Sequence, residues 1–310
     1  MADYDSMEII QSSGQNLDLV SNVWKRFRRH RGAIAGAIVL GIIVAMSFFA
    51  FLSPYDPLKS NVIDRFQPPS VSHPMGTDAL GRDLFTRILY GGRISLAVGV
   101  IAVSISLLIG IPMGALSGYY GGRTESVLMR ITDAFLSLPP FLVLILLSAI
   151  LREQGLPFLQ RNNVLTIAFV IGILSWMTFS RLVRAAFLTL REMDYVSASR
   201  ALGSSDRRII LGHILPNGIG VVIVEATLQL GYAIILEAGL SFLGFGIQQP
   251  TPSWGNLINS AQDHFIKYPW LAFFPGLIIF LTIISVNYIG DGLRDAFDPY
   301  KVLETVGEYT

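Results

Sequence analysis

The sequence predicts an all-α polytopic membrane protein with six transmembrane helices, and its composition and charge distribution carry that prediction. Of the 310 residues, 52% are hydrophobic and only 15% are charged. A soluble domain usually carries a charged residue at about one position in four. The charges here are also segregated, which leaves six apolar runs near the length of roughly 20 residues that crosses a bilayer. The excess of apolar residues therefore faces lipid.

The first predicted span runs from Ala33 to Leu52 and contains no charged residue. It is longer than the apolar core of a typical signal peptide, and no A-x-A cleavage site follows it, so a retained span is favoured over a cleaved one. The five further predicted spans are Ile94–Ser117, Ile131–Leu151, Val164–Ser180, Ile219–Ile247 and Leu271–Ile289.

Six spans bring both chain ends to the same side of the membrane. Five basic residues lie between Lys25 and Arg31, just before the first span, and the loop 181–213 is rich in arginine. Because cytoplasmic loops carry an excess of Lys and Arg, both termini are predicted to be cytoplasmic. The outer segment Ser53–Arg93 mixes basic residues with aspartates, which is typical of a folded element at the membrane surface.

Several classes of function are disfavoured by the residues that the chain lacks. A net charge of +1 leaves no excess of cations for nucleic acid, and the absence of cysteine excludes disulfides and thiolate metal sites. No G-x-x-x-x-G-K-[ST] loop occurs, so ATP hydrolysis would need another chain. An ion-coupled secondary transporter would show inverted repeats, and none is visible. The histidines lack the H-E-x-x-H spacing of an intramembrane metalloenzyme; they are His30, His73, His213 and His264.

Three glycines recur at every fourth position of the second span, at Gly110, Gly114 and Gly118. This spacing leaves one helix face without side chains, so that another helix can approach closely. The spacing does not distinguish a helix of the same chain from a helix of a second subunit.

The loop after the fourth span predicts two short helices. Asp194–Leu202 is rich in small residues, Gly203 suits a left-handed helix stop, and the following serines with Asp206 suit a new N-terminus. Pro216 is expected to close the second helix. A small-sided helix followed by a glycine turn makes a compact knob for docking on another protein, and a solvated connector is the alternative.

This loop, from Ser197 to Gly203 and on to Leu215-Pro216, resembles the EAA loop of binding-protein-dependent ABC importer permeases. In that family the loop forms a coupling helix that inserts into the ATPase subunit. Ser197 and Ser199 depart from the pattern, because they stand where the motif has Glu and its second Ala. The resemblance implies contact with the ATPase for Ser197, Ala198, Arg200, Ala201, Gly203, Ser205, Asp206 and Pro216.

Other stretches are similar to the dipeptide/oligopeptide/nickel branch of that family, in particular to the subunit with a long first outer loop. They are His73–Asp83 with Gly92–Leu96, Glu237–Gly244 with Pro252–Gly255, and Gly290–Pro299. The resemblance implies a type I ABC importer permease fold with a cytoplasmic coupling helix, in the cytoplasmic membrane of a bacterium or archaeon. It also implies import of peptides, or alternatively of nickel or another small solute.

The expected organisation follows from these motifs. Residues 1–32 form a cytoplasmic tail, 33–75 the first span and the start of the outer loop, 76–290 the permease core, and 291–310 a second cytoplasmic tail. The resemblance implies four kinds of partner, namely a sister permease, two ATP-binding cassette subunits that bind ATP and Mg, an extracytoplasmic solute-binding protein, and membrane lipid. The chain itself is expected to hold no cofactor or metal and to have no catalytic residue.

Polar residues inside spans are candidates for the solute path, since they usually face water or a protein interior. Glu225, Gln229 and Tyr232 share one stripe of the fifth span, whereas Glu237 is rotated away by about a third of a turn. A carboxylate on this stripe would attract a cationic group such as an ammonium, and hydrogen bonding between helices is the alternative. Asp133, near the cytoplasmic end of the third span, is a further ionisable candidate, and reaching the membrane interface is its alternative role.

The outer side carries the candidate contacts for the solute-binding protein, by resemblance. They are Asp78, Arg82, Asp83 and Trp254. The loop around Trp254 also contains Lys267, Tyr268 and Trp270, and such amphipathic side chains serve equally as anchors at the membrane interface.

Overall fold

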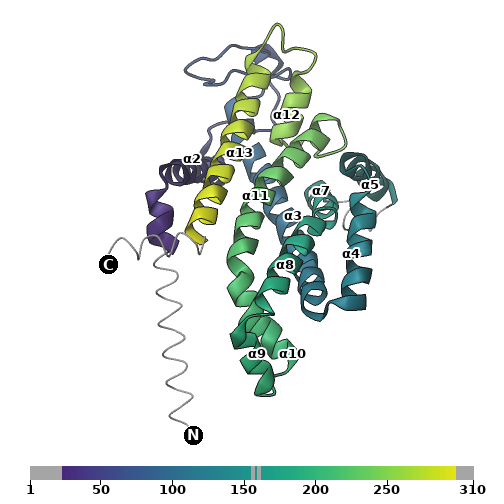
Figure 1. Ribbon diagram of the computed structural model, residues 1–310. Helices are drawn as coiled ribbons and strands as arrows, with labels where there is room; N and C mark the ends of the chain where they lie inside the picture. The colour runs from purple at the N-terminus through teal and green to yellow at the C-terminus, as the bar shows by residue number, and fades with distance from the viewer. Residues whose placement is uncertain (1–22, 155–157, 159–161, 298–310) are drawn as a thin grey trace.

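The computed structural model describes residues 23–154, 158 and 162–297, and within them the regular structure is helical. The terminal segments 1–22 and 298–310, which include most of the predicted tails, lie outside the described residues. The main helices, shown in Figure 1, are α2 (Arg31–Phe48), α3 (Leu84–Tyr120), α4 (Gly122–Leu136), α5 (Pro140–Gln154), α7 (Asn163–Ile173), α8 (Trp176–Leu190), α9 (Asp194–Ala201), α10 (Asp206–Ile209), α11 (Leu215–Phe242), α12 (Trp254–Ala261) and α13 (Trp270–Phe297).

Four helical segments among the described residues are long and apolar enough to cross a membrane. They are Arg31–Leu52, Leu84–Tyr120, Asp206–Phe242 and Trp270–Phe297. The other two predicted spans are bent pairs, α4 with α5 at 84° and α7 with α8 at 40°. The six predicted spans are therefore all present when each bent pair counts as one, and the two bends are features that the hydropathy pattern did not reveal.

The two bends have different local causes. Pro140 begins α5, where its missing N–H costs nothing because the first turn of a helix has no partner for that group. The break between α7 and α8 has no proline. There the N–H groups of Leu174 and Ser175 bond three residues back, to Ile171 at 3.2 Å and Gly172 at 3.3 Å, which tightens and ends the helix.

Several helices extend beyond the predicted spans. The α3 helix begins at Leu84, where the Asp83 carboxylate accepts a hydrogen bond from Thr86 N and so caps the first turn. With 37 residues it is about 55 Å long, more than the hydrocarbon core of a bilayer requires. The last helix, α13, continues to Phe297 and so includes residues expected in the C-terminal tail.

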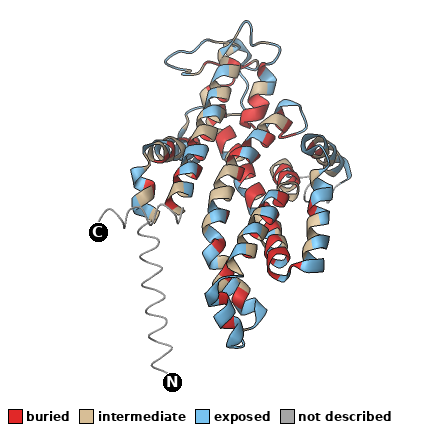
Figure 2. Ribbon diagram, in the orientation of Figure 1, coloured by how far each residue is buried: buried red, intermediate tan, exposed pale blue. Residues whose placement is uncertain are grey.

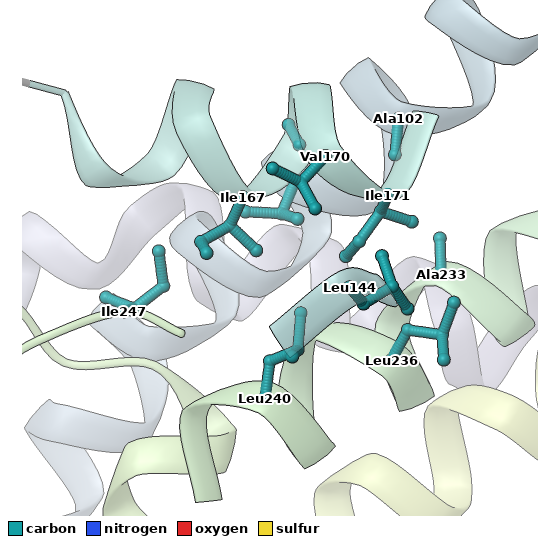
Figure 3. Packing of buried hydrophobic residues seen from close by; sticks show 11 residues of the cluster. Ala102, Leu144, Ile167, Val170, Ile171, Ala233, Leu236, Leu240 and Ile247 are labelled. Carbon is teal, nitrogen blue, oxygen red and sulfur yellow. The ribbon is translucent and has the colours of Figure 1, made fainter. Parts of the chain in front are cut away.

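The largest apolar core lies where α3, α5, α7 and α11 meet (Figure 3). Leu144, Ile171 and Leu240 are at most 1% exposed within it. By contrast, much of the outside of the bundle is exposed (Figure 2), and many of the exposed residues are large and apolar, as expected for a lipid-facing or partner-facing surface.

The glycine stripe of α3 packs against α8 of the same chain, which decides the alternative that the sequence left open. A Cβ added to Gly110 would lie 2.5 Å from Phe179 Cβ, and one added to Gly114 would lie 2.5 Å from Ser180 O. At Gly118 the same atom would lie 2.6 Å from Phe187 Cβ. These approaches leave no room for any side chain, so the glycines bring two helix backbones together within one subunit.

Candidate functional site

The predicted docking loop forms a helical knob at one end of the bundle, opposite the long outer loop and α12 (Figure 1). Val196 of α9, Ile209 of α10 and Ile214 are fully buried. They pack in one cluster with Val183 and Phe187 of α8 and with residues of α3 and α11. The knob is therefore packed against α3, α8 and α11, so a displacement of the knob would also displace these helices.

The turn at Gly203 has the geometry that its sequence predicts. Its φ of +79° lies in the left-handed region, where side chains are disfavoured. Gly203 N donates to Arg200 O at 3.0 Å and Ser204 N donates to Ser199 O at 3.1 Å, which together make a Schellman stop. Ser205 is the N-cap of α10, but its side chain makes no capping hydrogen bond.

Among the residues that the structure describes, one face of the knob has no neighbours. Nothing lies within 4 Å of the position of a Cβ on Gly203, and the adjacent Leu202 is 87% exposed. The other predicted contacts in the knob are exposed as well; they are Ser197, Ala198, Arg200, Ala201, Ser205 and Asp206. Sequence reasoning missed Leu202, although a large apolar residue next to the helix-stop glycine of a polar loop was a usable signal.

Two polar contacts fix the orientation of the knob against the end of α3. The Tyr119 hydroxyl donates to Asp206 Oδ1 at 2.7 Å. The Arg200 guanidinium lies 5.8 Å from the centre of the Tyr119 ring, within the range of a cation–π contact. Tyr119 therefore bridges α9 and α10, and Asp206 serves this bridge as well as the start of its own helix.

The expectation that Pro216 closes the second helix is wrong. The helical run continues from Asp206 to Phe242, and Pro216 lies in the first turn of α11. A π-helical turn, Ile210–Ile214, directly precedes it. The π-helical turn shifts the backbone hydrogen bonding just before the proline, since Leu215 N donates to Ile210 O, and Asn217 Nδ2 donates to His213 O at 2.7 Å.

The polar residues of α11 divide into two groups, as their helical spacing predicts. Gln229 and Tyr232 line a partly enclosed cavity of about 120 Å³ beside the two helix bends. Glu225 is partly buried and accepts a hydrogen bond from Gln229 Nε2 at 3.2 Å. Their role in solute passage remains a prediction.

Glu237 is fully buried inside the bundle and does not line this cavity. Its two carboxylate oxygens accept hydrogen bonds from Ser95 Oγ of α3 and Ser241 Oγ, both at 2.7 Å. The same two serine hydroxyls accept from Trp254 N at 3.2 Å and Ile247 N at 2.9 Å. Glu237 thus joins α3, α11 and the start of α12, which is the role of interhelical hydrogen bonding named as the alternative.

The three outer-loop residues expected to contact a binding protein point into the loop. Asp78, Arg82 and Asp83 are at most 8% exposed. Arg82 Nε donates to Asp78 Oδ2 at 2.7 Å, and Arg87 Nε lies 3.6 Å from the same oxygen. Arg87 Nη2 also donates to Gln249 at 3.1 Å, which ties the loop to the segment before α12. These side chains hold the loop together, so any docking contact made here belongs to other residues of its surface.

Trp254 is also a structural residue. Its side chain is fully buried, and Nε1 donates to Ile88 O at 3.0 Å. Among the neighbouring aromatic residues, Tyr268 stacks on Phe66 with ring centres 4.2 Å apart and contacts Trp270 edge to face. For Trp254, neither docking nor membrane anchoring describes the side chain, because it packs inside the subunit between α12 and α3.

Within the residues that the structure describes, no three His, Asp or Glu side chains gather as a metal-binding group. Asp133, the remaining ionisable candidate, lies at the surface with its carboxylate 2.5 Å from Arg181 Nη2.

The chain matches a known family over most of its length. Residues 110–301 match the model of the binding-protein-dependent transport system inner membrane component, and residues 19–69 match that of the N-terminal TM domain of oligopeptide transport permease C. The resemblance found in the coupling loop is thereby confirmed.

Individual relatives are similar over nearly their whole length. The oligopeptide transport system permease protein OppC of Bacillus subtilis is 39% identical over 93% of this chain and 92% of its own. The dipeptide transport system permease protein DppC of the same species is 40% identical, over 92% and 87%. The glutathione transport system permease protein GsiD of Pectobacterium atrosepticum is 39% identical, over 89% of each.

A solved structure with the same fold is a chain of the inward-facing MetNI methionine ABC transporter. The TM-score is 0.53 at 18% identity, over 67% of this chain and 95% of that one. The chain is accordingly a multi-pass inner membrane permease component that functions with ATPase and binding-protein partners. The matched family model and the relatives agree that the chain belongs to the binding-protein-dependent transport system inner membrane components.

Proposed function

We propose that this chain is one of two permease subunits of an ATP-driven importer of peptides, and that residues 194–216 couple it to an ATPase subunit. The observation that carries the coupling role is the knob around Gly203, which is exposed at its tip and rooted in α3, α8 and α11. A separate ATPase that grips this tip would move the spans directly. Two ATPase subunits, one for each permease, complete the assembly.

The peptide substrate rests on the relatives. Their names give oligopeptides, dipeptides and glutathione as the transported compounds, and all of these are short peptides. The partly buried carboxylate of Glu225 adds a chemical reason, because it would attract the ammonium group of a peptide.

The cytoplasmic location of both termini is supported by the contact between the start of the first described long helix and the end of the last one. The start of α2 and the end of α13 lie side by side, with His30 Nε2 3.9 Å from Asp295 Oδ2. The basic residues before α2 and those of the knob are then on the side where cytoplasmic loops carry their Lys and Arg.

A second permease is supported by an exposed ion pair at the cytoplasmic ends of the third and fourth predicted spans, where Asp133 lies just inside its span and Arg181 directly follows its own. The Arg181 and Asp133 side chains form an ion pair while 53% and 59% exposed. An ionisable group within a span, as Asp133 is, rarely faces lipid and usually faces protein or water. A sister subunit across an aqueous path would provide both surroundings for this pair.

The coupling role is tested by the substitution Gly203→Arg in a tagged chain purified from native membranes in mild detergent. The arginine would fill the open space at the tip and block the groove of the ATPase. We expect the wild-type chain to co-purify with two ATPase subunits and a sister permease, and the variant to lose the ATPase subunits and peptide uptake.

The matched control is Gly244→Arg. Gly244 also has a left-handed φ, of +82°, and open space around it, but it follows α11 at the other end of that helix. The Gly244→Arg variant imposes the same backbone strain as Gly203→Arg, and we expect it to retain the ATPase subunits. If both variants retain the ATPase subunits equally, the coupling role is wrong. If the wild-type complex takes up nickel but no peptide, the proposed peptide substrate is wrong.

A further inference from the structure

The cavity beside α11 lies where both bent helix pairs change direction. The junction of α4 and α5 contributes Leu136, Leu138 and Pro140, and the break before α8 contributes Leu174 and Ser175. The remaining lining residues are Phe135, Val143, Leu144, Met177, Thr178, Gln229, Tyr232 and Leu236. Broken helices turn their ends toward one point in the membrane, so this is a place where a span opens space for a ligand.

The cavity has the size of one apolar side chain. Its volume is about 120 Å³. An apolar protein cavity of about 150 Å³ stays dry and binds benzene, so this space accepts an isobutyl or phenyl group. Protein interiors are otherwise close-packed, and a void of this size removes contacts from every side chain that lines it. A ligand group that enters restores those contacts.

Polar groups occur on the α11 side of the cavity. Gln229 is 9% exposed and directs its amide nitrogen to the Glu225 carboxylate, at 3.2 Å, while Tyr232 is 47% exposed. A ligand whose apolar side chain occupies the cavity therefore meets the Tyr232 hydroxyl, which can form a hydrogen bond, and lies near the Glu225 carboxylate, which can attract a cation. An N-terminal amino acid residue carries this combination, because its apolar side chain and its ammonium are attached to the same carbon.

We propose that this cavity is a transit subsite for the apolar side chain of a peptide's N-terminal residue, whose ammonium group lies toward Glu225. The inference rests on the peptide transport proposed above and deepens it. The bends in α4–α5 and α7–α8 create the pocket, and α11 provides the polar groups that orient the peptide backbone. The permease thus favours peptides that begin with an apolar residue of moderate size.

The test fills the cavity. Val143→Phe places a larger side chain in the cavity, and Leu142→Phe makes the same aromatic addition at a neighbouring position that is 63% exposed and outside it. The complete transporter, with its binding protein saturated, is reconstituted in vesicles and supplied with Leu-Ala or Gly-Ala. Val143→Phe should lower the ratio of Leu-Ala to Gly-Ala uptake by about tenfold, and Leu142→Phe should leave it unchanged.

Each result has a stated meaning. An unchanged ratio, or an equal loss of both peptides in Val143→Phe, would overturn the subsite. If the subsite is overturned in this way while the wild-type complex transports both peptides, the proposed function still stands. Failure of the wild-type complex to transport any peptide would overturn the function and the subsite together.

A labelling experiment keeps the proposal testable if Val143→Phe does not assemble. The chain has no cysteine, so Thr178→Cys creates a single thiol at the cavity, and Thr189→Cys is the control on the same helix outside it. Leu-Ala should slow maleimide labelling at 178 severalfold more than Gly-Ala does, with no effect at 189. The subsite would be overturned if both peptides slowed labelling at position 178 equally. It would also be overturned if a lipid chain protected this cysteine constantly, without any peptide present.

Discussion

The two sides of α8 contact their neighbours in different ways. Toward α3, backbone meets backbone across the stripe of Gly110, Gly114 and Gly118, without room for a single Cβ. Toward α4, contact is made by the edge-to-face pair Phe135–Trp176 and by the ion pairs Arg184–Glu125 and Arg181–Asp133 along an open groove. All residues of α4 are described, and Thr132 is its one buried residue.

This difference indicates which parts of the subunit move together. Close packing resists separation, because every displaced atom loses its dispersion contacts. Partly exposed ion pairs exchange their partners for water at small cost. The knob follows α8 directly in the chain, so we expect α3 and α8 to move with it as one body while α4 separates from them readily.

The largest effect is expected at the glycine stripe. Gly114→Val would force a side chain against the backbone of α8 and should destabilise the folded subunit by about 3 kcal/mol. Gly41→Val is the matched control in α2, because no described residue lies within 4 Å of a Cβ added at Gly41. Thermal unfolding of the purified subunit in detergent measures both. Similar losses in the two variants would mean that the seam is no tighter than an open helix face.

A smaller effect is expected at Arg191, a charged side chain at the end of the contact between α3 and α8. Arg191 Nη1 donates to Gly118 O at 2.9 Å and so satisfies a carbonyl at the end of α3. Arg191→Met should lower stability by about 1 to 2 kcal/mol, since hydrogen bonds to charged groups contribute more than neutral ones. Arg123→Met, at an exposed position of α4, provides the comparison in the same unfolding assay. A larger loss at Arg123 would reverse the proposed ranking of the two interfaces.

The smallest effects are expected across α4. Double-mutant cycles should give a coupling of about 1 kcal/mol for Glu125–Arg184 and less than about 0.5 kcal/mol for Asp133–Arg181. The order follows exposure, because the first pair is 26% and 31% exposed and the second 59% and 53%. Both couplings should shrink as salt is raised. A salt-independent coupling of several kcal/mol would show that α4 is fastened as firmly as α3.

Local patterns predicted much of the knob around Gly203. The run of small residues before Gly203, the glycine itself and Asp206 identified two helices and the stop between them, since capping depends on adjacent residues. Pro216 was misread for the same reason. Its neighbours alone suggested an end to the helix, whereas a π-helical turn ahead of it lets the helix continue.

The outer face was predicted less well. Asp78, Arg82 and Trp254 have the side chains of a docking surface, but each is buried. The partners of Trp254 are Ile88 and Ser95, which are more than 150 residues away in the chain. No local pattern carries that information, and the same limit explains why the glycine stripe indicated a close contact without identifying α8.

The sequence by itself determined which segments enter the membrane, which loop holds the knob and where its turn lies, because hydropathy, charge bias and glycine stereochemistry act over a few neighbouring residues. Only the tertiary structure decided that α4–α5 and α7–α8 bend, that Gln229 faces a cavity and that Glu237 is sealed between helices. Those outcomes depend on the rotation and crossing of helices, which are set by contacts between residues distant in the chain.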